Sequence, residues 1–101
     1  MRHMNSSVRN FLRAKAHDLS PVVMVGKNGL DDAVVKALDE ALTHHELVKV
    51  KFQSNRDGMK QITSDLTEAT KAELVGTVGF ISIFFRPSEK KLIEIPKSLT
   101  R

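Results

Sequence analysis

The sequence predicts an α/β layered domain, in which helices back a four-stranded sheet, and three observations indicate this class. Apolar residues recur at helical spacing in three segments, residues 8–17, 30–45 and 59–72. Residues 46–53 (ELVKVKFQ) alternate between apolar and polar side chains, which is typical of a half-buried strand. Residues 80–86 are mostly apolar on both faces, which suits a strand in the interior of a sheet.

The first helix is predicted from Val8 to about His17. Ser6-Ser7 offers an N-cap, because a serine hydroxyl accepts a hydrogen bond from an unpaired N–H group of the first turn. Ser20-Pro21 ends the segment, since proline disfavours the helical conformation in the residue before it. The side chains expected to face the core are Val8, Phe11, Leu12, Ala16 and Leu19.

Two sets of basic residues lie beside these apolar faces. Arg9, Arg13 and His17 stand four apart on the first helix, either as phosphate contacts or as a solvated helix flank. Lys49 and Lys51 are expected on the exposed side of the alternating strand. Both sets are candidate contacts for a polyanion.

The most informative stretch is residues 21–30, PVVMVGKNGL. Its apolar run, residues 22–25, predicts a buried strand, and the following glycine-bracketed turn leads directly into a helix. Glycine at both ends of the turn lets the backbone bend through positive φ and approach a ligand closely. Unpaired N–H groups at the start of the next helix favour an anion such as phosphate. The turn is either a phosphate grip, with Lys27 adding charge and Asn28 an amide, or a plain connector. It consists of Gly26, Lys27, Asn28 and Gly29.

The second helix is predicted to end at about His45. Asp31 and Asp32 in its first turn and His44 and His45 in its last turn match the helix dipole. Adjacent side chains on a helix point about 100° apart, so the two histidines are not expected to bind a metal without further ligands. Capping and packing are their favoured roles, with a nucleic-acid contact as the alternative.

The rest of the chain supplies the remaining elements. Met59 opens the apolar stripe of the third helix and is interpreted as a core residue. Two strands, residues 74–78 and 80–86, meet near Gly79, and their aromatic side chains are expected in the core rather than stacked on bases. These aromatic residues are Phe80, Phe84 and Phe85. Residues 92–95 either add an edge strand or lie along the surface.

Length, charge and composition narrow the class of protein. A chain of 101 residues is expected to form one small domain. Its net charge of +4 is divided between two basic ends, residues 1–30 and 74–101, and an acidic middle, residues 31–73, as suits a protein with one basic face. The lack of cysteine excludes disulfides and thiolate metal sites and predicts a cytoplasmic protein, and no apolar run approaches the length of a membrane span.

Three motifs together resemble a known family. They are PVVMVGKNGL, then HHELVKVKF at the end of the second helix, and later the strand GFISIFFRP, and they occur in this order along the chain. In sequence and spacing they closely resemble the CRM domain (chloroplast RNA splicing and ribosome maturation) in its stand-alone bacterial, YhbY-type form. The resemblance predicts one domain over residues 7–96. Residues 1–6 are then expected to be disordered or left over from expression, and residues 97–101 to form a loose tail.

The resemblance implies an α-β-α-β-α-β-β fold with a mixed four-stranded sheet, similar to the C-terminal domain of translation initiation factor three. It also implies an RNA-binding protein that associates with precursors of the large ribosomal subunit. The RNA-binding residues that it implies are the GxxG loop of residues 26–29, the block from His44 to Lys51, and Arg86. Phe85 departs from some relatives, which carry an aromatic residue with a polar group there, and so lacks that hydrogen bond.

We therefore predict a monomer that recognises the RNA backbone without catalysis, cofactor or small-molecule substrate. The lack of Tyr and Trp predicts modest sequence specificity. The alternative is a protein-interaction module that docks on a ribosomal protein or an assembly factor through the acidic middle segment. The candidate RNA contacts are Gly26, Lys27, Asn28, Gly29, Arg9, Arg13, His44, His45, Lys49, Lys51 and Arg86.

Overall fold

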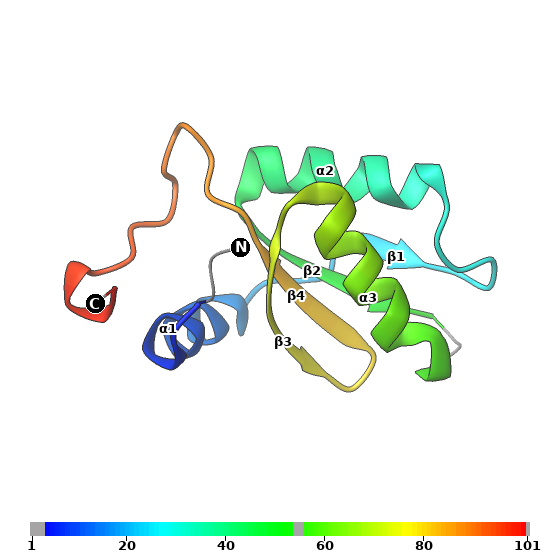
Figure 1. Cartoon of the computed structure of the whole chain (residues 1–101), viewed down its shortest axis with the longest axis horizontal. Helices are drawn as coiled ribbons and strands as arrows, with labels where there is room; N and C mark the ends of the chain where they lie inside the picture. The colour runs from blue at the N-terminus through cyan, green and yellow to red at the C-terminus, as the bar shows by residue number, and fades with distance from the viewer. Residues whose placement is uncertain (1–3, 54–55, 101) are drawn as a thin grey trace.

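The computed structural model of the protein describes residues 4–53 and 56–100, and its elements follow the predicted order (Figure 1). They are α1 (Ser6–Ala16), β1 (Val23–Val25), α2 (Asp32–His45), β2 (Leu47–Phe52), α3 (Arg56–Thr70), β3 (Glu73–Val78), β4 (Ile81–Phe85) and the 3-10 helix η1 (Lys97–Leu99). Within the described ranges, no helix is long and apolar enough to cross a membrane.

The four strands form one mixed sheet with the order β1-β2-β4-β3. β1 runs parallel to β2, whereas β4 is antiparallel to both β2 and β3. β4 therefore lies inside the sheet, as its apolar residues on both faces predicted, and β1 and β3 are the edge strands. The predicted fold class, with a mixed four-stranded sheet backed by helices, is confirmed.

Each face of the sheet carries its own hydrophobic cluster. One face packs against α2 and α3, and the opposite face, called the α1 face here, packs against α1 and the C-terminal tail. Successive residues of a strand point to opposite faces, so the two clusters alternate along β2 and β4. The first cluster contains Val23, Val25, Leu38, Leu42, Val48, Val50, Phe52, Met59, Leu66, Ala72 and Phe84. The cluster on the α1 face contains Val8, Leu12, Ala16, Leu47, Val75, Ile83 and Phe85.

Four side chains are more exposed than the sequence predicted. Leu19, expected in the core, lies beyond the end of α1 and is 42% exposed. Phe80 lies in the turn between β3 and β4 and is also 42% exposed, so its predicted core position is wrong, although the other two phenylalanines of this segment are buried. Val22 and Met24 are exposed because β1 is an edge strand and α1 does not cover it, so the strand is buried on one face only.

The N-cap of α1 connects the two ends of the described chain. The Asn5 side chain accepts a hydrogen bond from the Val8 N–H (2.8 Å), so the cap precedes the serine pair that was predicted to provide it. The Asn5 amide also donates to the carbonyl oxygen of Leu99 in η1 (2.6 Å). This contact holds the last described turn of the chain against the start of α1.

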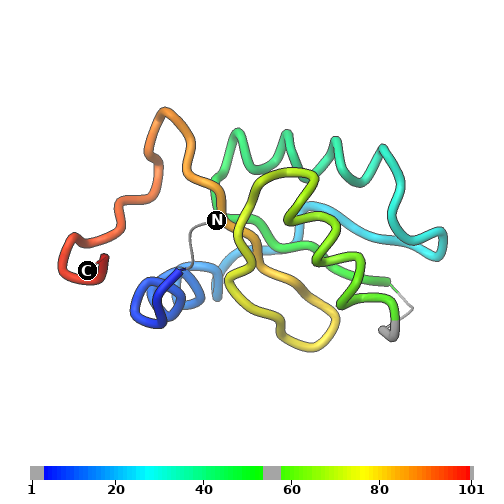
Figure 2. The backbone as a smooth tube through the Cα atoms, in the orientation of Figure 1, coloured from blue at the N-terminus to red at the C-terminus, as the bar shows by residue number. Residues whose placement is uncertain are grey.

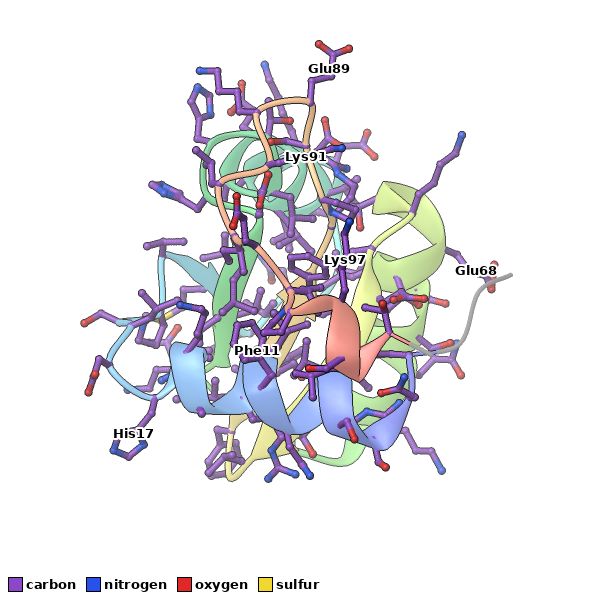
Figure 3. All side chains as sticks on the ribbon, turned by 90° about the vertical axis from the view of Figure 1, so that its left-hand side faces the viewer. Phe11, His17, Glu68, Glu89, Lys91 and Lys97 are labelled. Atoms are coloured by element: carbon purple, nitrogen blue, oxygen red, sulfur yellow. The ribbon has the colours of Figure 1, made fainter. Side chains whose placement is uncertain are left out.

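The segment before η1 lies along the surface and forms no strand, which decides between the two predictions for residues 92–95. Ile93 and Ile95 are partly buried against the cluster on the α1 face. Figure 3 shows Phe11 of α1 on the side that meets this tail segment. The tail thus packs beside α1 on the same face of the sheet.

Candidate functional site

The connection between β1 and α2 is a tight turn of residues 26–29. The Gly29 N–H donates to the Gly26 carbonyl oxygen (3.0 Å) and closes the turn around Lys27 and Asn28. Gly29 has a φ of 71°, in the left-handed region that favours glycine, whereas the φ of Gly26 lies outside that region. The expectation that both glycines bend the chain through positive φ is therefore correct for Gly29 and wrong for Gly26.

The start of α2 offers less to an anion than the sequence suggested. Asp31 is the N-cap: its carboxylate accepts a hydrogen bond from the Val34 N–H (2.9 Å) and its carbonyl oxygen accepts one from the Val35 N–H (3.2 Å). Asp31 and Asp32 also place two carboxylates at this helix end, which repel an anion. The Asp31 cap therefore leaves fewer helix N–H groups for an anion than the sequence suggested.

Lys27 and Asn28 provide the open donors of the turn. Both side chains are exposed, and neither their backbone N–H groups nor their side chains form an intramolecular hydrogen bond within the described part of the chain. Two N–H groups and one ammonium group, on two exposed residues of a four-residue turn, are therefore without an internal acceptor among the described residues. Each of these N–H groups can donate a hydrogen bond to an anion such as phosphate.

Substituting the two glycines one at a time is expected to have unequal effects on folding. In Gly29→Ala, an alanine must adopt the positive φ of this position, and its Cβ lies 3.5 Å from the Ile62 Cδ1. We therefore expect a loss of about 1 kcal/mol of unfolding free energy. In Gly26→Ala, the Cβ meets only the Gln53 Oε1 at 3.5 Å, an ordinary contact, and we expect a change within about 0.5 kcal/mol. Urea unfolding measures both, and equal losses would contradict this account of the turn.

A row of four side chains crosses the α1 face of the sheet beside this turn. The strand register places Met24 of β1 next to Lys51 of β2, Lys51 opposite Ile81 of β4, and Ile81 opposite Val78 of β3. Met24 is 53% exposed and Val78 58%, Lys51 is exposed, and Ile81 is half-buried. Figure 2 shows α1 toward one end of the sheet and the turn at the other. Ile81 packs against the cluster on the α1 face, and the other three side chains of the row are exposed. We call these four residues the open row.

Two basic residues border the open row. Arg13 extends from α1 over β3, where its Nε would lie 3.5 Å from a Cβ added at Gly76. The ammonium group of Lys49 donates to the carbonyl oxygen of Leu19 (2.9 Å) and lies 3.4 Å from that of His17, so it binds the C-terminal end of α1. The structure thus brings Arg13, Lys49 and Lys51 together on one face, and Arg9 lies one turn before Arg13 on the same helix.

His44 and His45 lie at the opposite end of α2 from the turn (Figure 1), a separation of about 20 Å along a helix of this length. The Nδ1 of His44 donates to the carbonyl oxygen of Glu40 (2.8 Å), one turn earlier in the helix. The two rings are tilted by 53° with centroids 6.5 Å apart. The described residues contain no group of three or more His, Cys, Asp or Glu side chains placed to hold a metal ion.

Arg86 also lies away from the turn and bonds to the protein itself. Its guanidinium donates to the Asp39 carboxylate (2.7 Å) and carbonyl oxygen (3.0 Å), to the Thr43 hydroxyl (3.0 Å) and to the carbonyl oxygen of Thr70 (2.7 Å). Four of the five guanidinium N–H donors are engaged in this way. Arg86 therefore ties the middle of α2 to the end of α3, which leaves little of it for the RNA contact that was predicted.

Glu46 is a buried residue that sequence reasoning missed. Its φ is 67°, and its N–H donates to the Leu42 carbonyl oxygen at the end of α2 (2.9 Å). One carboxylate oxygen accepts hydrogen bonds from the Ser88 N–H (2.9 Å), the Ser88 hydroxyl and the Leu92 N–H (3.0 Å), and the other accepts one from the Ile93 N–H (2.9 Å). Burial favours the protonated acid, but the hydrogen bonds from Ser88, Ile93 and Leu92 outweigh it and lower the pKa of Glu46.

Comparison with known proteins shows similarity along nearly the whole chain. The model of the CRS1 / YhbY (CRM) domain family matches residues 4–86. A Haemophilus influenzae protein named "RNA-binding protein" is 40% identical over 98 residues, which cover 96% of this chain and 99% of the relative. The Bacillus subtilis protein named "Probable RNA-binding protein YqeI" is 37% identical over 90 residues, 87% of this chain and 94% of the relative. The solution structure of a hypothetical protein from Staphylococcus aureus superposes with a TM-score of 0.79 at 35% identity, covering 93% of this chain and 100% of that one.

Proposed function

The chain belongs to the CRS1 / YhbY (CRM) domain family, and from this premise we propose that it binds RNA by holding the RNA backbone at the turn of residues 26–29. The observation that carries the proposal is the set of open donors at Lys27 and Asn28, which no group of the described chain occupies. The names of the two curated relatives, both RNA-binding proteins, support the same partner.

The turn suits a phosphate for three reasons. The N–H groups of Lys27 and Asn28 donate to phosphate oxygens, and the ammonium group of Lys27 offsets their charge. The missing side chain of Gly26 lets the RNA backbone approach the protein backbone closely, which accounts for a glycine at a position without positive φ. The protein holds the RNA in this way and performs no chemistry on it.

The other predicted contacts divide into two groups. Lys51, Lys49, Arg13 and Arg9 continue the basic surface from the turn across the α1 face, and we include them in the RNA interface. His44, His45 and Arg86 lie toward the other end of α2, where Arg86 bonds to α2 and α3. We leave them outside the interface, although His45 lines one cavity together with Lys49 and Leu19.

RNA titrations at several salt concentrations test whether the turn of residues 26–29 binds the RNA backbone. With about five phosphates neutralised, we expect the logarithm of the association constant to fall with the logarithm of the salt concentration with a slope of about −3 to −4 on single-stranded RNA. Lys27→Ala combined with Asn28→Asp is expected to weaken binding roughly tenfold or more and to make the slope less steep by about one.

Lys36→Glu is the matched control, because Lys36 is an exposed lysine on α2 and the substitution lowers the net charge by two units, as the double variant does, outside the proposed interface. It is expected to change affinity by less than about twofold. If a folded Lys27/Asn28 double variant binds RNA as the control does, the grip does not lie at this turn.

We further propose that the RNA is ribosomal RNA of large-subunit precursors and that the protein acts in their assembly, as a cytoplasmic monomer. The resemblance of its motifs to the stand-alone bacterial members of the family supports this partner. In gradient sedimentation of cell extracts, the protein is expected to travel with large-subunit precursors and to leave them after ribonuclease treatment. Continued association after ribonuclease treatment would favour docking on a ribosomal protein instead.

A further inference from the structure

In the open row, Ile81 packs against the cluster on the α1 face, whereas Met24, Lys51 and Val78 are exposed. Farther along the same strands, Leu47, Ile83 and Phe85 are buried under α1 and the tail. The open row lies at the margin of this cover, and two of its four side chains, Met24 and Val78, are apolar and more than half exposed. Exposed apolar side chains gathered on one face indicate a binding surface more often than exposed apolar side chains scattered singly.

Its chemistry and position suit the bases of a nucleic acid. A base has an apolar face and polar edges, and the row offers aliphatic side chains on both sides of one ammonium group, that of Lys51. Four adjacent strands place Met24 and Val78 about 14 Å apart, and four-stranded sheets of the RRM class hold two or three bases on one face. Arg13 and Lys49 border the row and supply positive charge for the neighbouring phosphates.

The row is also continuous with the proposed backbone grip. Met24 is followed by Val25, the last residue of β1, and then by Gly26, the first residue of the turn. An RNA strand held at Lys27 and Asn28 therefore reaches the row without crossing a helix, because α1 lies toward the other end of the sheet (Figure 2). A double helix keeps its bases stacked inside, so it offers the row no base faces.

We propose that the open row of Met24, Lys51, Ile81 and Val78 contacts unpaired bases of the RNA whose backbone the turn holds, so that the protein selects single-stranded over double-stranded RNA. This inference rests on the proposed RNA-binding function and adds to it the kind of RNA that the site accepts.

The test compares one variant of the row with a control of equal exposure. Met24→Asp and Leu92→Asp each add one negative charge at a side chain that is 53% exposed, and Leu92 lies in the tail, away from the row. The probes are a fluorescent 12-nucleotide single-stranded RNA of low secondary structure and a 12-base-pair RNA duplex. Val78→Asp, at a residue 58% exposed on the other edge strand, is the second variant if Met24→Asp disturbs folding.

We expect Met24→Asp to weaken binding of the single strand about five- to tenfold, because it removes an apolar contact with a base. The duplex is expected to lose no more than about two- to threefold, through repulsion by the new charge two residues before Gly26. Leu92→Asp is expected to change both by less than about twofold, since it alters the net charge equally without touching the row. Lys27→Ala is expected to weaken both, because both RNAs carry the backbone that the turn holds.

Three other results would overturn the inference in distinguishable ways. If Lys27→Ala weakens binding but Met24→Asp and Val78→Asp behave as Leu92→Asp does, the grip stands and the row does not contact bases. If Met24→Asp weakens single-strand binding while Lys27→Ala does not, the row binds RNA independently, and the proposal that the turn of residues 26–29 binds the RNA backbone is wrong. If the protein sediments as a dimer that Met24→Asp disperses without altering RNA affinity, a second copy of the chain covers the row.

Discussion

Glu46→Ala is expected to lower the free energy of unfolding by about 3 kcal/mol, because it removes a buried carboxylate that accepts four hydrogen bonds from the segment after β4. The N–H groups of Ser88, Leu92 and Ile93 then lose their acceptor. Ile93, which packs against the α1 face, is expected to detach together with this segment. Urea unfolding measures the loss as a lower midpoint.

Glu46→Gln tests whether the loss comes from the hydrogen bonds of the carboxylate, and Glu89→Ala is the control. The glutamine amide keeps one oxygen for the three hydrogen bonds on one side but turns its NH₂ group toward the Ile93 N–H, so we expect about half of the alanine effect. Glu89 lies in the same segment, and Figure 3 shows its side chain pointing away from the protein, so Glu89→Ala is expected to change stability by less than about 0.5 kcal/mol. Equal losses for the two alanine variants would contradict the role of Glu46.

The same contacts predict a dependence of stability on pH. Because folding lowers the pKa of Glu46, its contribution is fully present above the ordinary glutamate pKa of about 4.3 and is lost as the pH falls through the lower folded-state pKa. The wild type is therefore expected to lose more stability than Glu46→Gln when the pH is lowered from neutral to about 3. Parallel pH profiles for the two proteins would show that the carboxylate is not responsible.

Arg86→Ala is expected to lower the free energy of unfolding by about 2–3 kcal/mol. The substitution removes four hydrogen bonds that join α2 to α3 and leaves the carbonyl oxygen of the buried Thr70 without this donor. Arg86→Lys is expected to recover about half, since a lysine ammonium has no planar fork to reach both helices at once. Thermal or urea unfolding of the three proteins measures the series.

The ion pair alone is not expected to account for this effect. Asp39 is 55% exposed on its side chain, so Asp39→Ala is expected to cost no more than about 1 kcal/mol, although its carboxylate lies 2.7 Å from the guanidinium. An Asp39→Ala loss as large as that of Arg86→Ala would assign the stability to the ion pair. A folded Arg86→Lys variant with weakened RNA binding and unchanged stability would instead return Arg86 to the RNA interface.

The secondary structure followed from local patterns, because each long element has a clear period. Residues 46–53 alternate strictly and form β2 almost as predicted, and the apolar faces of β4 predicted its interior position. The apolar run of β1 was ambiguous, since a continuous run of four residues does not show whether both faces are covered. The exposure of Met24 follows from the position of α1, which no local pattern encodes.

The residue types of the candidate site are visible in the sequence, but the geometry of the site is not. The turn of residues 26–29 is visible as a sequence motif, yet the Asp31 cap and the Gly29 hydrogen bond reduce the donors that remain for an anion. Glu46 and Arg86 gave no sequence signal of their partners, because Ser88 and Asp39 lie more than 40 residues from them along the chain. From sequence alone, a polar residue next to a strand is predicted to be exposed, because its partners are distant along the chain.

The most direct test of the central claim is the NMR titration of ¹⁵N-labelled protein with a short single-stranded RNA. Binding at the turn predicts that the largest changes in amide chemical shift occur at Lys27, Asn28 and their neighbours, with further changes along Met24 and Lys51. Amide shifts that change only around His44, His45 and residues 86–93 would place the RNA at the other end of α2 and contradict the claim.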